Sequence, residues 1–167
     1  MDDREAGLRR RLADAYVRSA PAGIRLAYLL TGDRAAAEDL VQEAFVRFLG
    51  RFRFLRYPED FDPYLRRTIV NLSKNHFRRR AVEREYLERE GPRIEDVSTG
   101  PDVATHDTLR SALLRLPLRQ RTAIVLRYYE DLPDATIAEL LGCRQATVRS
   151  LVARGLDALR TTPEVIT

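Results

Sequence analysis

The segment Asp134–Ala153 has residue types and a spacing that suit two short helices built to bind DNA. Ala138 is small, Gly142 follows four residues later, and Val148 follows six residues after that. A small residue lets two helices cross closely, a glycine allows a left-handed turn, and an apolar β-branched residue packs inward. Other apolar residues fill the remaining inward positions: Ile137, Leu141, Cys143 and Leu151. The spacing predicts a helix-turn-helix, with Asp134 as the N-cap of its first helix.

The second helix of this pair would present a polar and basic face to the outside. Gln145, Arg149, Ser150 and Arg154 lie on it, a set suited to base edges and phosphates of a major groove. Arg149 is nearer the helix start and offset by about 100° from Ser150, which predicts that it reads a base. A plain helical hairpin with a solvated face is the alternative. The complete inward set, together with three arginines outside, favours DNA binding.

The charges of the chain are unevenly distributed. The net charge is +4, but residues 47–80 hold ten basic against three acidic residues, and residues 144–160 hold four against one. Between them, residues 83–107 hold eight acidic against three basic residues. Two basic blocks around an acidic one indicate two contact surfaces for a polyanion, although ordinary solvated surface could also look like this.

Helical periodicity dominates, and strand signals are nearly absent. An early helix is expected over 8–29. Apolar residues recur at three- and four-residue steps over Asp33–Leu49, with Asp33 as a plausible N-cap. Residues 56–63 read as a loop whose Asp62-Pro63 starts the next helix, from Tyr64 into Arg80. Pro117 should interrupt two further helices over 109–116 and 119–129.

Composition excludes several classes of protein. No apolar run approaches the roughly 18 residues of a membrane span, and the charged N-terminus lacks the apolar core of a signal peptide. One cysteine cannot build a disulfide framework or a multi-thiolate zinc site. The sequence therefore predicts a cytoplasmic protein without cofactor or metal.

Three segments together resemble the extracytoplasmic-function sigma factors of the sigma-70 family: Leu30–Phe45, Tyr64–Arg80 and Leu113–Leu159. The resemblance implies an all-α chain of two small helical domains joined by an acidic flexible linker. A region 2-like domain would span 1–82, the linker 83–107, and a region 4-like helix-turn-helix domain 108–162. It also implies binding to core RNA polymerase and the recognition and opening of promoters.

The resemblance assigns roles to residues by position. On the second segment, one set would face the −10 element: Tyr64, Asn71, Lys74, Asn75, Arg78 and Arg79. On the recognition helix, another set would contact the −35 element: Arg144, Gln145, Thr147, Arg149, Ser150 and Arg154. Asp39, Gln42 and Glu43 would meet the clamp helices of the polymerase largest subunit, and the second domain would meet the polymerase flap. Promoter DNA is the other expected partner, and the resemblance leaves room for an anti-sigma factor.

The sequence departs from the family at three places. The family usually has Trp where Tyr64 stands, and a Ser-Tyr pair where Pro133-Asp134 stands. It often has Pro or Val and then Gly before the recognition helix, where this chain has Arg144, Gln145 and Ala146. Arg144 and Gln145 are therefore expected to add contacts and shift the −35 preference.

Two other functions compete with this interpretation. A stand-alone helix-turn-helix regulator would leave 33–80 without a task. A metal-dependent nuclease could use Glu59, Asp60 and Asp62, but turn and capping chemistry accounts for these carboxylates. His76 and His106 have no partners at ligand spacing, so the sequence predicts that the chain is not an enzyme.

Overall fold

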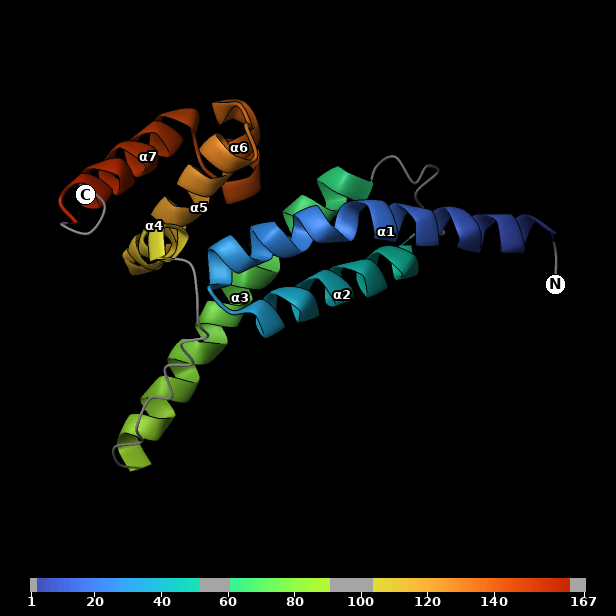
Figure 1. The fold of residues 1–167 in the computed structure, drawn as a ribbon, viewed down its shortest axis with the longest axis horizontal. Helices are drawn as coiled ribbons and strands as arrows, with labels where there is room; N and C mark the ends of the chain where they lie inside the picture. Colours follow the sequence, from blue (N-terminus) through green and yellow to red (C-terminus); the bar gives the residue numbers. More distant parts are fainter. Residues whose placement is uncertain (1–2, 52–60, 91–103, 163–167) are drawn as a thin grey trace. The chain divides into compact units, whose positions relative to one another are not determined.

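The computed structural model describes residues 3–51, 61–90 and 104–162, and over these ranges the chain is helical with no strand. The chain divides into two compact units, residues 1–73 and 74–167. Figure 1 shows the helices in chain order, from α1 in blue to α7 in red. The prediction of an all-α fold is confirmed.

The N-terminal unit is built from α1 (Asp3–Thr31), α2 (Arg34–Arg51) and the first part of α3 (Phe61–Glu90). In Figure 1, α1 and α2 lie side by side along much of their length. Gly32, with φ of 71°, ends α1 in a left-handed turn that favours glycine. The Asp33 carboxylate then accepts a hydrogen bond from the Ala36 N–H at 3.1 Å, which confirms the predicted N-cap of α2.

The core of this unit forms where its three helices meet at Gly23. A Cβ at Gly23 would lie 3.0 to 3.3 Å from side chains of Leu65, Ile69 and Val41. Because glycine has only a hydrogen atom in place of a side chain, α1 can approach α2 and α3 closely at this point. The predicted apolar stripe of α2 is buried at Ala37, Leu40, Val41, Ala44 and Phe48, whereas Phe45 is half-buried and Leu49 is 41% exposed. The stripe therefore ends at Phe48, because the helix turns Leu49 away from the core.

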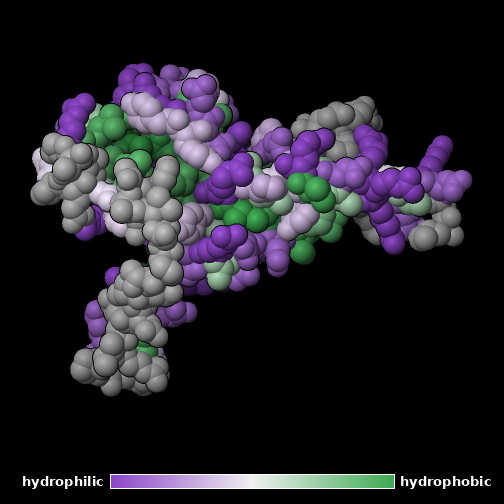
Figure 2. Space-filling model, viewed as in Figure 1, coloured by the Kyte–Doolittle hydropathy of each residue, from purple (hydrophilic) through white to green (hydrophobic). Residues whose placement is uncertain are grey.

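The C-terminal unit contains the rest of α3, α4 (Ala104–Arg115), α5 (Leu118–Ile124), a π-helical turn (Val125–Tyr129), α6 (Asp134–Leu141) and α7 (Gln145–Arg160). Pro117 separates α4 from α5, as predicted. Leu113, Leu116 and Ile124 form a core cluster with Leu156 and Leu159 of α7 packed against it. Figure 2 shows apolar surface of this unit in green over the α5 and α7 region, bordered by hydrophilic side chains.

Several helices differ from their predicted bounds. α3 continues to Glu90 and α4 begins at Ala104, so both ends of the segment predicted as a linker are helical. Residues 91–103 lie outside the described part of the chain. The helix predicted over 119–129 changes at Val125 into a π-turn, in which the Glu130 N–H donates to the Val125 carbonyl at 3.1 Å.

Candidate nucleic-acid interface

The helix-turn-helix forms from α6, a turn at Gly142, and α7. Gly142 has φ of 62°, and the Cys143 N–H donates to the Ala138 carbonyl at 3.0 Å, closing the end of α6. Ile137 and Val148 are fully buried and Ala138 is 7% exposed, so the two helices pack through the predicted small and β-branched residues. Cys143 is half-buried with a free thiol. The predicted inward positions are thus occupied as expected.

The outer face of α7 carries the residues expected at the −35 element. Arg144 is the N-cap residue of α7, with extended backbone, and Gln145 opens the helix. All six expected side chains are exposed: Arg144, Gln145, Thr147, Arg149, Ser150 and Arg154. The face therefore offers arginine, amide and hydroxyl groups to an approaching ligand, which are the groups that contact phosphates and base edges.

Asp134 does not cap α6, contrary to the prediction. It is the first residue of the helix, Pro133 occupies the N-cap position, and no side-chain cap bond forms there. Its Oδ1 lies 3.3 Å from Nη1 of Arg127, and its Oδ2 lies 3.8 Å from Nη1 of Arg149. Because Asp134 is already inside the helix, its carboxylate is not placed to cap it and instead pairs with two arginines from other elements. Arg127, Asp134 and Arg149 are called the Asp134 cluster below.

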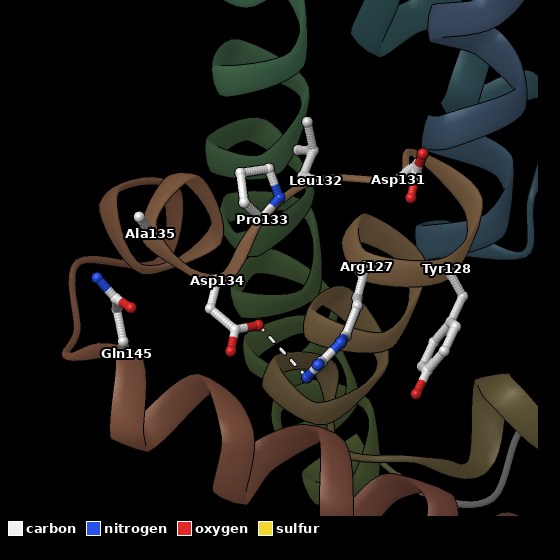
Figure 3. A pocket seen from close by; sticks show the side chains of 8 residues that line it. All are labelled: Arg127, Tyr128, Asp131, Leu132, Pro133, Asp134, Ala135 and Gln145. Atoms are coloured by element: carbon white, nitrogen blue, oxygen red, sulfur yellow. Dashed lines mark ion pairs between the residues drawn. The ribbon is translucent and has the colours of Figure 1, made fainter.

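A cleft of about 510 Å³ lies beside this cluster. Figure 3 shows the Asp134 and Arg127 side chains pointing toward one another across it, with Gln145 at the start of α7. Tyr128 lines it from the π-turn, and Asp131 lines it from the loop between the π-turn and α6. The cleft thus lies at the end of the helix-turn-helix where both helices begin.

The residues expected at the −10 element lie on α3. Asn71, Lys74, Arg78 and Arg79 are exposed and Asn75 is half-buried. Asn71, Lys74, Asn75 and Arg78 follow one another at steps of three, one and three residues, which places them on one helix face. Tyr64 is half-buried, with its ring centroid 5.2 Å from that of Phe48. Tyr64 therefore packs partly into the core of the N-terminal unit.

The residues expected to meet polymerase lie on the solvent side of α2. Asp39 and Gln42 are exposed, while Glu43 is half-buried and pairs with Arg47 at 2.6 Å. This pair is an exposed contact between residues four apart on one helix, so it contributes little to stability. The acidic face is available on the surface of the N-terminal unit.

The structure also contains a buried arginine that sequence reasoning missed. Arg121 is 3% exposed, its Nη1 donates to the Leu114 carbonyl at 3.3 Å, and its Nε has no hydrogen-bond partner. Its guanidinium lies 4.9 Å from the centroid of the Phe77 ring. Burial lowers the pKa of Arg121 to about 10, because desolvation disfavours the charged form. In the sequence, only the position of Arg121 within the helix predicted over 119–129 could have indicated that its side chain points inward.

Of the carboxylates considered for a metal-dependent enzyme, only Asp62 lies in the described part of the chain. Asp62 lies in the first turn of α3 and accepts a hydrogen bond from Ser19, while Glu59, Asp60 and the side chain of His106 lie outside the described part. Within the ranges that the structure describes, no three His, Cys, Asp or Glu side chains gather as metal ligands. No helix in those ranges is long and apolar enough to span a membrane.

Comparison with known proteins finds two family models in the same order along the chain. Sigma-70 region 2 matches residues 15–82, and sigma-70 region 4 matches residues 106–159.

Two curated proteins are similar over most of the chain. The RNA polymerase sigma-E factor of Streptomyces avermitilis is 34% identical over 151 residues, covering 88% of this chain and 82% of that protein. The ECF RNA polymerase sigma factor SigE of Mycolicibacterium smegmatis is 37% identical over 142 residues, covering 81% of this chain. The match covers only 55% of the length of the M. smegmatis protein.

One solved structure is similar in fold and sequence. The sigma factor RpoE of Bartonella quintana, crystallised in complex with the anti-sigma factor NepR, matches with a TM-score of 0.71 and 25% identity. The match covers 89% of this chain and 93% of that one.

Proposed function

The chain belongs to the extracytoplasmic-function RNA polymerase sigma factors of the sigma-70 family, and from this membership we propose how its helices divide the work of promoter recognition. Sigma factors are transcription initiation factors and not enzymes. They bind core RNA polymerase and promoter DNA. The observation that carries the proposal is that regions 2 and 4 occur in one chain, each on helices whose polar faces are exposed.

We assign the −35 element to the outer face of α7. A helix-turn-helix inserts its second helix into the major groove with the N-terminal residues deepest. Arg149 lies in the second turn of α7 and is 60% exposed at its side chain, which supports a role in reading a base. Arg154 is one turn further from the helix start than Ser150, which suits contact with a phosphate.

We assign the −10 element to α3. Amide side chains can read the edge of an unpaired base, and basic side chains hold the phosphates of a single strand. Asn71 supplies such an amide beside Lys74 and Arg78 on the same helix face. Because Tyr64 packs against Phe48, we propose that it also helps to hold α3 on the core of the N-terminal unit.

The face of α2 that carries Asp39, Gln42 and Glu43 is proposed to meet the clamp helices of the polymerase largest subunit. The C-terminal unit is proposed to meet the flap, and residues 83–107 to connect the two domains over 1–82 and 108–162. An anti-sigma factor is proposed as a further partner, because the similar Bartonella protein is held by one. The chain would act in the cytoplasm, where the polymerase works.

The alternative of a stand-alone helix-turn-helix regulator accounts only for the C-terminal half. It gives no task to residues 15–82, which match sigma-70 region 2. Copurification separates the two functions, because a sigma factor binds core polymerase without DNA and a stand-alone regulator does not need to.

Run-off transcription with core polymerase on genomic fragments tests the proposal. We expect discrete start sites that share one sequence near −10 and another near −35. Core polymerase alone, on the same fragments, provides the control. Start sites that do not change when the chain is added would contradict the proposed function.

A further inference from the structure

The carboxylate of Asp134 is shared by two arginines that reach it from different elements. Arg127 comes from the π-turn and Arg149 from α7, and each contacts a different carboxylate oxygen, at 3.3 and 3.8 Å respectively. Asp134 is the first residue of α6, where the positive end of the helix dipole stabilises a carboxylate. The carboxylate is therefore held in place by its own helix as well as by its partners.

Burial distinguishes this cluster from the other ion pairs of the described residues of α7. The Asp134 side chain is 19% exposed, that of Arg127 is 37% exposed and that of Arg149 is 60% exposed. The pair of Arg160 with Asp157, near the end of α7, is 76% and 74% exposed. Partial burial reduces screening by water and salt, so the Asp134 carboxylate orients its partners more strongly than an exposed one would.

The Asp134 carboxylate is mostly buried and the Arg149 guanidinium is mostly exposed, so their contact favours one orientation of the Arg149 side chain. One nitrogen of Arg149 lies 3.8 Å from the Asp134 carboxylate at the edge of α7 that adjoins α6, while most of that side chain stays accessible. At this distance the contact is an ion pair and not a hydrogen bond, so charge attraction restrains the side chain and leaves its N–H groups available to a base. A restrained arginine loses less rotamer freedom when it binds a base.

We propose that Asp134 is a positioning residue that sets the −35 sequence preference, by fixing the direction in which Arg149 presents its guanidinium to a base. The inference rests on the proposed function of α7. Arg127 contacts the other carboxylate oxygen of Asp134. A substitution of Arg127 would therefore also disturb Asp134 and cannot serve as a control for Arg149.

The test uses the full chain with core polymerase on a promoter library in which the −35 element is randomised and the −10 element is fixed. Asp134→Asn removes the charge at constant size, and Arg149→Ala removes the proposed reader. Both variants should relax base preference at the same −35 position, by about fivefold or more, the lower limit for one arginine–base contact. The double variant should be no more relaxed than Arg149→Ala, because Asp134 acts through Arg149.

Two carboxylates provide matched controls. Asp131→Asn removes a charge from the same cleft, and asparagine tolerates its left-handed backbone. Asp157→Asn removes a carboxylate that pairs with an arginine of α7 away from the cleft. Both controls should retain the wild-type base preference.

Thermal unfolding of each variant shows whether it folds. If Asp134→Asn does not fold, Asp134→Glu is used instead. This variant keeps the charge but displaces the carboxylate by one methylene, so it should shift the base preference at the same −35 position. The proposal is overturned if Arg149→Ala relaxes preference and the folded Asp134 variants do not. It is also overturned if they lower transcription equally on every sequence. Absence of promoter-specific transcripts with the unaltered chain would instead refute the proposed function.

Discussion

Asn71 is an exposed amide in a stretch of α3 whose neighbours Val70, Leu72 and Ser73 are buried. Its backbone is thus fixed by the core of the N-terminal unit while its side chain reaches solvent. A polar group presented from a rigid helix reads a base more precisely than one on a loop. This placement supports the proposal that Asn71 reads an extruded base.

We expect Asn71→Ala to impair promoter opening while core polymerase binding is unchanged. Loss of one polar base contact should cost about 1–3 kcal/mol. Permanganate reactivity of thymines in the bubble measures opening, and gel filtration with core polymerase measures binding. Glu83→Ala, exposed on the same helix and outside the proposed face, is the control. Unchanged thymine reactivity in Asn71→Ala would refute the assignment.

At the scale of elements, the angle between α6 and α7 depends on the left-handed turn at Gly142. A residue with a Cβ is strained in that conformation whatever space surrounds it. This turn orients α7 relative to α6, and with it the outer face of α7 that is proposed to contact the −35 element.

Gly142→Ala should lower the free energy of unfolding of the C-terminal unit by about 1 kcal/mol, because alanine resists positive φ. Urea unfolding followed by circular dichroism measures the change. Gly7→Ala is the matched control: Gly7 lies within α1 with open space around it, so alanine there should stabilise the helix slightly. Equal stability of Gly142→Ala and the unaltered chain would argue against a strained turn.

Elements that depend on neighbouring residues in the chain could be predicted from the sequence. Asp33 caps α2, Pro117 separates α4 from α5, and Gly142 turns between α6 and α7, all through interactions within a few residues. The π-turn at Val125 could not be predicted, because its register is set by the tertiary packing of residues such as Leu126, which is fully buried.

The site residues show the same division. The exposure of the six side chains expected at the −35 element follows from helical spacing, so this exposure could be predicted. The role of Asp134 was predicted wrongly, since local capping rules consider only nearby N–H groups and not arginines that the fold brings from elsewhere. Arg121 was missed because composition favours arginine on the surface.

At the scale of the whole chain, charge should limit DNA binding by the free protein. The net charge is only +4, and residues 83–107 carry a local excess of acidic groups. The basic segments of the chain therefore attract DNA while the acidic segment repels it. Strong non-specific binding needs a net positive charge larger than this.

We expect the free chain to bind promoter duplex with a dissociation constant of about 10⁻⁴–10⁻⁶ M at physiological salt, the range of non-specific binding. Core polymerase should add sequence preference. Fluorescence anisotropy with promoter and scrambled duplexes, with and without core polymerase, measures both effects. Tight binding by the free chain to promoter and not to scrambled duplex would contradict this expectation.

The Asp134 cluster has a consequence for the thermodynamics of ion release. Each phosphate that a protein neutralises frees counterions from DNA, and the number freed sets how steeply affinity falls with salt. Arg127 and Arg149 already share one carboxylate of their own protein before any DNA is bound. If the carboxylate stays paired in the complex, the number of phosphates that the protein neutralises is smaller than its number of arginines at the interface. Recognition at the −35 element should therefore depend less on ionic strength than a count of basic side chains implies.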